Sequence, residues 1–159
     1  MAPPASSPPH TAPAGLSRES RRLAGVLIVL VPTVAFGGTS ILSMLIGDPA
    51  YAENELRRDL WRAGHAHAGI LLILALVALR YVDEATLSDR WRGVVRHAIP
   101  LAAILLPASF FLSVLSPDAT EPNALINLAY VGAVSLTVGL IALGIGLIRD
   151  PAPSMETDG

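Results

Sequence analysis

Two histidines at the start of an apolar stretch are the residues best suited to chemistry. His65 and His67 lie in the segment 64–69, Gly-His-Ala-His-Ala-Gly. Ionisable residues inside a membrane are costly and are functional candidates by default, and histidine can ligate haem iron or another metal or carry a proton near neutral pH. Residues two apart on a helix point about 200° apart. Each histidine is therefore a candidate ligand, but one metal ion is not expected to take both.

The distribution of charge predicts the elements that position these histidines. The chain has 159 residues, of which 52% are hydrophobic and 15% charged, whereas a soluble domain carries about 25% charged residues. Its charges are absent from four long stretches, each near the roughly 20 residues that cross a bilayer as a helix. We predict an all-α, polytopic membrane protein, an antiparallel bundle of four transmembrane helices at about residues 23–46, 62–82, 96–116 and 123–148.

The segments outside these helices have a different composition. Residues 1–20 and 150–159 are rich in proline, alanine and small polar residues, which predicts disordered tails around a transmembrane domain at 21–149. The chain has no cysteine, which excludes disulfides and cysteine nucleophiles. A net charge of −2 without a basic stripe gives no indication of nucleic-acid binding.

The arginines predict the orientation. All 11 basic residues are arginines, and together with the abundant alanine and proline this suggests a GC-rich bacterial genome. With the N-terminus inside, eight arginines lie on the cytoplasmic side and three on the outer side, and cytoplasmic loops are the ones enriched in basic residues. We therefore expect a bacterial cytoplasmic (inner) membrane protein with both termini in the cytoplasm.

Most polar side chains of the spans gather at one end of the predicted bundle. An antiparallel arrangement brings the start of the second helix to the start of the fourth, so His65 and His67 are expected to share a pocket in the outer half with Asn127 and Tyr130. Gly69 lies on the same side as His65 and leaves room for a bulky planar group. Haem and quinone are the leading ligands. The alternatives are histidines that simply lie at the headgroup interface and polar groups that only join helices.

The fourth helix carries two faces of different character. A small-residue face includes Gly132, Gly139 and Gly146 and predicts close helix packing, either within the chain or with a second copy or a larger membrane complex. The polar face, with Asn127 and Tyr130, is expected to point into the bundle. In the first and third helices, Pro32 and Pro107 are expected to introduce kinks. Three serines of the third helix are expected to bond to carbonyls that Pro107 loosens, namely Ser109, Ser113 and Ser116.

The segment from Arg62 to Gly69 resembles the His-x-His helix start in small bacterial relatives of haem–copper oxidase subunit I, which implies a haem-ligating histidine. Its size and four-helix plan are also similar to the hydroxylaminobenzene mutase family, which implies a membrane enzyme with a histidine general acid–base. The haem–copper pattern needs histidines in other spans, and these are missing here. The mutase pattern has an acidic residue where this chain has His67.

Three functions follow as hypotheses. The preferred one is a ligand or cofactor pocket around His65 and His67. The second is a mutase-like or proton-transfer activity in which a histidine acts as general acid–base. The third is an accessory subunit that packs against a larger membrane complex.

Overall fold

The computed structural model describes residues 15–149, and within that range the only regular elements are helices. Four of them are long and apolar enough to cross a membrane, which confirms the predicted all-α, four-span plan. The proposed tails lie largely outside the described residues. The elements are α1 (Arg18–Gly47), α2 (Pro49–Glu53), α3 (Glu55–Tyr81), α4 (Asp89–Ser113), the 3₁₀ helix η1 (Ala124–Asn127) and α5 (Leu128–Ile148).

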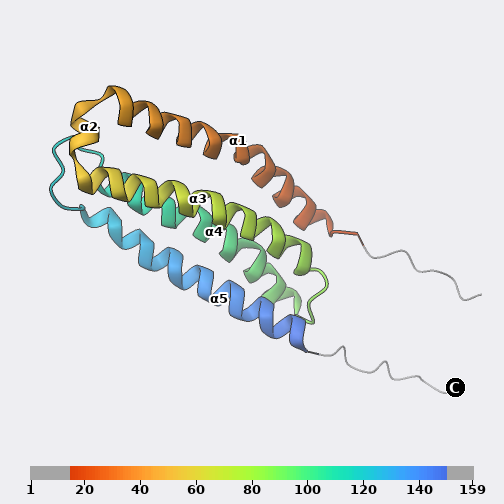
Figure 1. Ribbon diagram of the computed structural model, residues 1–159. Helices are drawn as coiled ribbons and strands as arrows, with labels where there is room; N and C mark the ends of the chain where they lie inside the picture. Colours follow the sequence, from red (N-terminus) through yellow and green to blue (C-terminus); the bar gives the residue numbers. More distant parts are fainter. Residues whose placement is uncertain (1–14, 150–159) are drawn as a thin grey trace, which may run out of the picture.

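The long helices run antiparallel, with α4 packed between α3 and α5 and α1 packed along α3 (Figure 1). The start of α1 and the end of α5 lie at one end of the bundle, which we call the terminal end. The short helix α2 and the turn into η1 lie at the other, which we call the α2 end. Because α1 packs on α3 and not on α5, the bundle is open on one side.

Local capping explains why the helices extend beyond the apolar stretches. The Ser17 side chain accepts a hydrogen bond from the Ser20 N–H, so α1 begins at Arg18, inside the predicted tail. Asp48 caps α2, whose first residue is Pro49. Asn54 then caps α3, which starts at Glu55, well before the predicted boundary. These polar caps lie outside the apolar pattern, so the hydropathy of the sequence did not predict α2 or the first turns of α3.

The small-residue face of α5 packs inside the chain. A Cβ atom added at Gly132 would lie 2.9 Å from Leu106 Cγ, and one added at Gly139 would lie 2.7 Å from Ile99 Cγ1. At Gly146 it would lie 2.6 Å from Leu87 Cγ. The small-residue face therefore packs within the chain, as the first of the two alternatives predicted, because α4 and the loop before it already cover all three glycines. An oligomer or a larger complex through this face has no support from the described residues.

The polar face of α5 points outward, and this corrects the expected direction. Tyr130 is 72% exposed and Asn127 is also exposed. The Asn127 side chain donates to the Ala124 carbonyl, 3.0 Å away and on its own segment. The rotation of α5 follows from its glycines, because they allow the closest backbone approach and so select the face that meets α4.

The prolines lie inside continuous helices. α1 changes direction near its middle, where Pro32 lies (Figure 1). α4 continues through Pro107, and Ser109 and Ser113 donate to the carbonyls of Leu106 and Phe110. The expected hydrogen bonds from these two serines to backbone carbonyls are thus present. Neither reaches the Ala103 carbonyl, which is the one that loses its helical donor because Pro107 has no N–H. Ser116 lies exposed beyond the end of α4.

A buried arginine joins three segments at the terminal end. Arg96 of α4 donates to Ser20 Oγ (3.1 Å) and Ser17 Oγ (3.0 Å), and forms ion pairs with Glu19 (2.5 Å) and Asp83 (2.6 Å). The Ser17 N–H also donates to Asp83. We call this set the Arg96 cluster. Because Leu27 and Ser20 are the only buried residues of α1, the cluster is the main polar attachment of that helix.

Asp83 makes the attachment sensitive to acid. Burial opposes its ionisation, but hydrogen bonds from Arg96 and from the two serines outweigh burial and hold the pKa of Asp83 below its ordinary value of 3.8. A carboxyl whose pKa is lower in the folded state stabilises the fold above the ordinary value, and this contribution is lost as pH falls through the folded pKa.

We predict that Asp83→Asn lowers the free energy of unfolding in detergent by about 2 kcal/mol at pH 7. The difference from the native chain should shrink as the pH is lowered below about 4. Asp89→Asn is the matched control, because the Asp89 carboxylate pairs with Arg92 while fully exposed. Parallel pH profiles for Asp83→Asn and the native chain would contradict the role given to Asp83.

We also predict opposite effects for two glycines of α5. Gly139→Ala should lower the free energy of unfolding by about 1–2 kcal/mol, because its methyl group meets the buried Ile99. Gly144→Ala should leave it unchanged or raise it, since nothing lies within 4 Å of a Cβ at Gly144 and alanine favours the helix. Thermal unfolding of the two variants in the same detergent measures the contrast. Equal stabilities would argue against the packing of this face on α4.

Candidate functional site

His65 lies against α1 at a place where that helix has no side chains. A Cβ atom at Gly38 would lie 2.9 Å from His65 Nε2 and 3.0 Å from Cε1. One at Gly37 would lie 3.9 Å from Nδ1. The imidazole therefore needs the Gly37–Gly38 pair to reach the α1 backbone. The sequence did not predict a role for this pair, although small residues within an apolar span allow helix backbones to approach closely.

His67 meets a different helix. Its ring packs on Phe110 of α4, with ring centroids 5.2 Å apart. Its Nδ1 lies 2.8 Å from the Ala63 carbonyl oxygen. Because a carbonyl can only accept, Nδ1 donates its proton there and, in the neutral ring, Nε2 keeps its lone pair. This contact fixes both the tautomer and the orientation of the ring.

The two histidines do not converge on a common point. One contacts α1 and the other α4, in agreement with their spacing of two residues. Within residues 15–149, no three side chains of the metal-binding types come together. A site that takes both rings on one ion has no support from this geometry, and metal binding by either ring alone stays a prediction.

The other residues of the predicted pocket lie elsewhere. Asn127 and Tyr130 are exposed on α5, which packs on α4 and only touches α3. The structure therefore does not bring them to His65 or His67. A Cβ at Gly69 would make an ordinary contact with Val34 of α1, at 3.7 Å. The space beside Gly69 that was expected to hold a planar group is occupied by α1.

A groove with three ionisable residues in its lining opens beside His65 at the α2 end. Its volume is about 530 Å³, and its lining comes from α1 and α3: Ile41, Asp59, Arg62, Ala63, His65 and Ala66. We call it the His65 groove. Asp59, Arg62 and His65 are spaced three residues apart, which places them along one face of α3. The sequence did not predict Asp59 as a pocket residue, because Asp59 precedes the charge-free stretch that begins at Ala63.

An aromatic cluster holds the start of α3 behind this groove. The Arg57 guanidinium lies over the Trp61 ring, 4.9 Å from its centroid, and its Nε donates to the Val114 carbonyl at 3.1 Å. Trp61 packs edge-on against Phe111, which in turn covers Gly64. Arg57 therefore serves packing, because its side chain is buried between α3 and the end of α4.

Tyr51 completes this cluster from α2. Its ring is fully buried, with its centroid 5.6 Å from that of Trp61. Burial raises the pKa of the Tyr51 hydroxyl, and the nearby charge of Arg57 only partly opposes this rise. Tyr51 is therefore neutral at physiological pH and acts as a packing residue that fixes α2 to α3. The α3 side of the groove is thus held by the aromatic cluster, whereas α1 alone forms the other side.

The chain matches no protein-family model, and comparisons with curated proteins and with solved structures find no similar chain. The resemblances drawn from the segment around His65 and His67 stay predictions.

We predict an energetic coupling between Gly38 and His65. Gly38→Ala should lower the free energy of unfolding by about 1 kcal/mol, because the added methyl group meets the imidazole. In a His65→Ala background the same change should cost nothing, which gives a coupling energy of about 1 kcal/mol in a double-mutant cycle. Gly25→Ala is the control on the same helix, since nothing lies within 4 Å of a Cβ there. A coupling energy of zero would mean that His65 does not contact α1.

Proposed function

We propose that this chain is an integral protein of the bacterial cytoplasmic membrane that binds a small polar-headed ligand in the His65 groove, and that a quinone head group is the best match. The observation that carries the proposal is the convergence of Asp59, Arg62 and His65 on one groove between two membrane-spanning helices. Ionisable side chains in such a position are functional candidates by default.

The chemistry of the lining favours a quinone. A quinone carbonyl accepts hydrogen bonds, which the Arg62 guanidinium and His65 Nδ1, the ring nitrogen that is not packed against Gly38, can donate. Asp59 can accept from a hydroxyl of the reduced form. The isoprenoid tail would leave the groove past Ile41 and along the exposed apolar surface of α1, which would face lipid.

Haem fits His65 less well. Axial ligation needs a free lone pair on a ring nitrogen, with open space in front of it for a flat macrocycle. The Nε2–Cε1 edge of the His65 ring lies against Gly38, so only Nδ1 is left for a ligand, and a flat macrocycle in front of Nδ1 would meet α1 near Gly37. A haem on His65 would have to displace α1 from α3, whereas a quinone needs only the open side of the groove.

The proposed orientation places the groove in the outer half of the membrane. Eight arginines belong to the terminal end and three to the α2 end, and basic residues are enriched on the cytoplasmic side. The terminal end would then face the cytoplasm, and the His65 groove would open near the outer surface.

We predict that a reporter active only in the cytoplasm will be active when fused to the C-terminus, and inactive when inserted at Ala119 in the loop between α4 and η1. Alkaline phosphatase, which is active only outside, should give the reverse pattern. The opposite result for both fusions would place the His65 groove on the cytoplasmic side.

We predict saturable binding of a short-chain ubiquinone analogue, decylubiquinone, to the purified protein. The Trp91→Phe variant retains Trp61 as its only tryptophan, so quenching of its fluorescence reports binding at the α2 end. His65→Ala and Arg62→Gln should each weaken binding about tenfold, the effect of losing one hydrogen bond to a charged or strongly polar group. Binding would be measured in detergent and again in nanodiscs.

His97→Ala is the matched control, because His97 is exposed on α4 near the terminal end and bonds only to its own helix. It should bind decylubiquinone like the native chain. Quenching that does not saturate, or that is equal in all variants, would overturn the proposal. A Soret band on addition of haemin that is lost in His67→Ala, without quinone binding, would replace it with a haem site at His67.

A further inference from the structure

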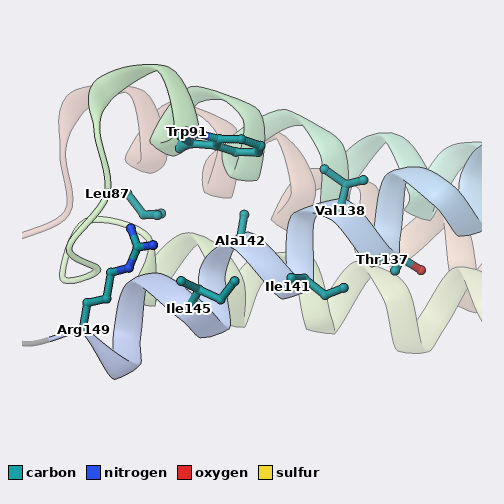
Figure 2. Close-up of a pocket in the computed structure, with 8 residues that line it drawn as sticks. All are labelled: Leu87, Trp91, Thr137, Val138, Ile141, Ala142, Ile145 and Arg149. Carbon is teal, nitrogen blue, oxygen red and sulfur yellow. The ribbon is translucent and has the colours of Figure 1, made fainter.

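A second groove lies at the terminal end, between α4 and the last turns of α5 (Figure 2). Its volume is about 380 Å³. The Trp91 ring from the start of α4 lies over one side, and α5 forms the floor (Figure 2). We call it the Trp91 groove. The residues that define it are Leu87, Trp91, Val138, Ile141, Ile145 and Arg149.

The interior of the Trp91 groove suits a hydrocarbon chain. Aliphatic side chains form its floor, and its one hydroxyl, on Thr137, donates to the Ala133 carbonyl of its own helix. The groove extends along α5 from Thr137 to Arg149, which is about 18 Å of helix. This is close to the thickness of one leaflet of the hydrocarbon core, about half of 30 Å. A polar ligand would find no hydrogen-bonding partner at this depth.

The mouth of the groove suits an anion. Arg149 follows the last residue of α5, and its side chain extends toward Leu87 at the end of the groove (Figure 2). A guanidinium forms bidentate hydrogen bonds with phosphate. Trp91 is 49% exposed and lies in the first turn of α4, and tryptophan is enriched at the membrane–water interface. Within residues 15–149 this end carries eight arginines against four carboxylates, those of Glu19, Asp83, Glu84 and Asp89, so its net charge is positive.

We propose that the Trp91 groove binds one anionic phospholipid, with an acyl chain along Val138, Ile141 and Ile145 and its phosphate on Arg149. Trp91 would cover the glycerol region from the α4 side. The proposal stands independently of the His65 groove, which lies at the other end of the bundle. It requires only that α4 and α5 span the membrane, as their length and hydropathy indicate.

The test uses Trp91 as the sensor. In the Trp61→Phe variant Trp91 is the only tryptophan, and bromine atoms on an acyl chain quench its fluorescence on contact. The variant is placed in phosphatidylcholine vesicles that contain a small fraction of either brominated phosphatidylglycerol or brominated phosphatidylcholine. We expect brominated phosphatidylglycerol to reach half-maximal quenching at an about fivefold lower lipid fraction than brominated phosphatidylcholine. A fivefold difference corresponds to the attraction between one arginine and an anionic lipid.

Two variants separate this site from general attraction to anionic lipid. Arg149→Gln should abolish the preference, whereas Arg22→Gln, which removes an exposed arginine of the same end on α1, should preserve it. Ala142→Leu, which fills the groove, should reduce quenching by both lipids. Equal quenching by the two lipids, or equal effects of Arg149→Gln and Arg22→Gln, would overturn the proposal.

Native mass spectrometry of the unmodified chain provides a check that does not depend on the tryptophan variant. The native chain, released from micelles that contain both lipids, should retain one phosphatidylglycerol molecule. The fraction of Arg149→Gln that retains phosphatidylglycerol should be about fivefold lower. A dimer without bound lipid would show that a second copy occupies the groove and would overturn the lipid assignment. Retention of phosphatidylcholine to the same extent would do so as well.

Discussion

The Arg96 cluster is the interaction on which the arrangement of α1 depends. In lipid, apolar side chains gain little by leaving one helix surface for another, so helices are joined by close packing and polar contacts. α1 has long, exposed apolar side chains along most of its length and only two buried residues. Its attachment to Arg96 and Asp83 at the terminal end therefore fixes its position along α3. Removing one partner would leave a buried charge without compensation, which is strongly destabilising.

The remaining three spans are joined by large side chains that pack directly over glycines of the neighbouring helix. Ile99 and Leu106 of α4 cover Gly139 and Gly132 of α5, and Phe111 covers Gly64 of α3. α4 is thus the central helix, with a neighbour on each side. This packing leaves the polar face of α5 outward and keeps α5 away from His65. The site at His65 consequently forms between α1 and α3, where the His65 groove opens.

The sequence predicted the fold class and the number of spans, because charge-free stretches of about 20 residues leave little alternative. It did not predict which helix faces meet. The asparagines and Tyr130 of α5 suggested an inward polar face, but its glycines decided the rotation by allowing the closer approach. Arg96 and Asp83 lie outside or at the edge of the apolar spans, so hydropathy gave no sign that they meet Ser17 and Ser20. Likewise, the contact between Gly38 and His65 depends on how far α1 is shifted along α3. The Arg96 cluster and α2 hold the two ends of α1 and so help to set this position.

The contact between His65 and Gly38 tests this arrangement most directly. It forms only if α1 is attached at the terminal end and also runs along α3 as far as Gly38. Solid-state NMR on protein labelled with ¹³C and ¹⁵N at histidine and glycine, in lipid bilayers, can observe it. The chain has four histidines and 13 glycines, so assignment with His65→Ala and Gly38→Ala variants is practical. We expect a through-space correlation between the His65 ring and the Gly38 Cα. The absence of that correlation, together with a correlation between the His65 ring and Tyr130 in a second sample labelled at histidine and tyrosine, would contradict the arrangement.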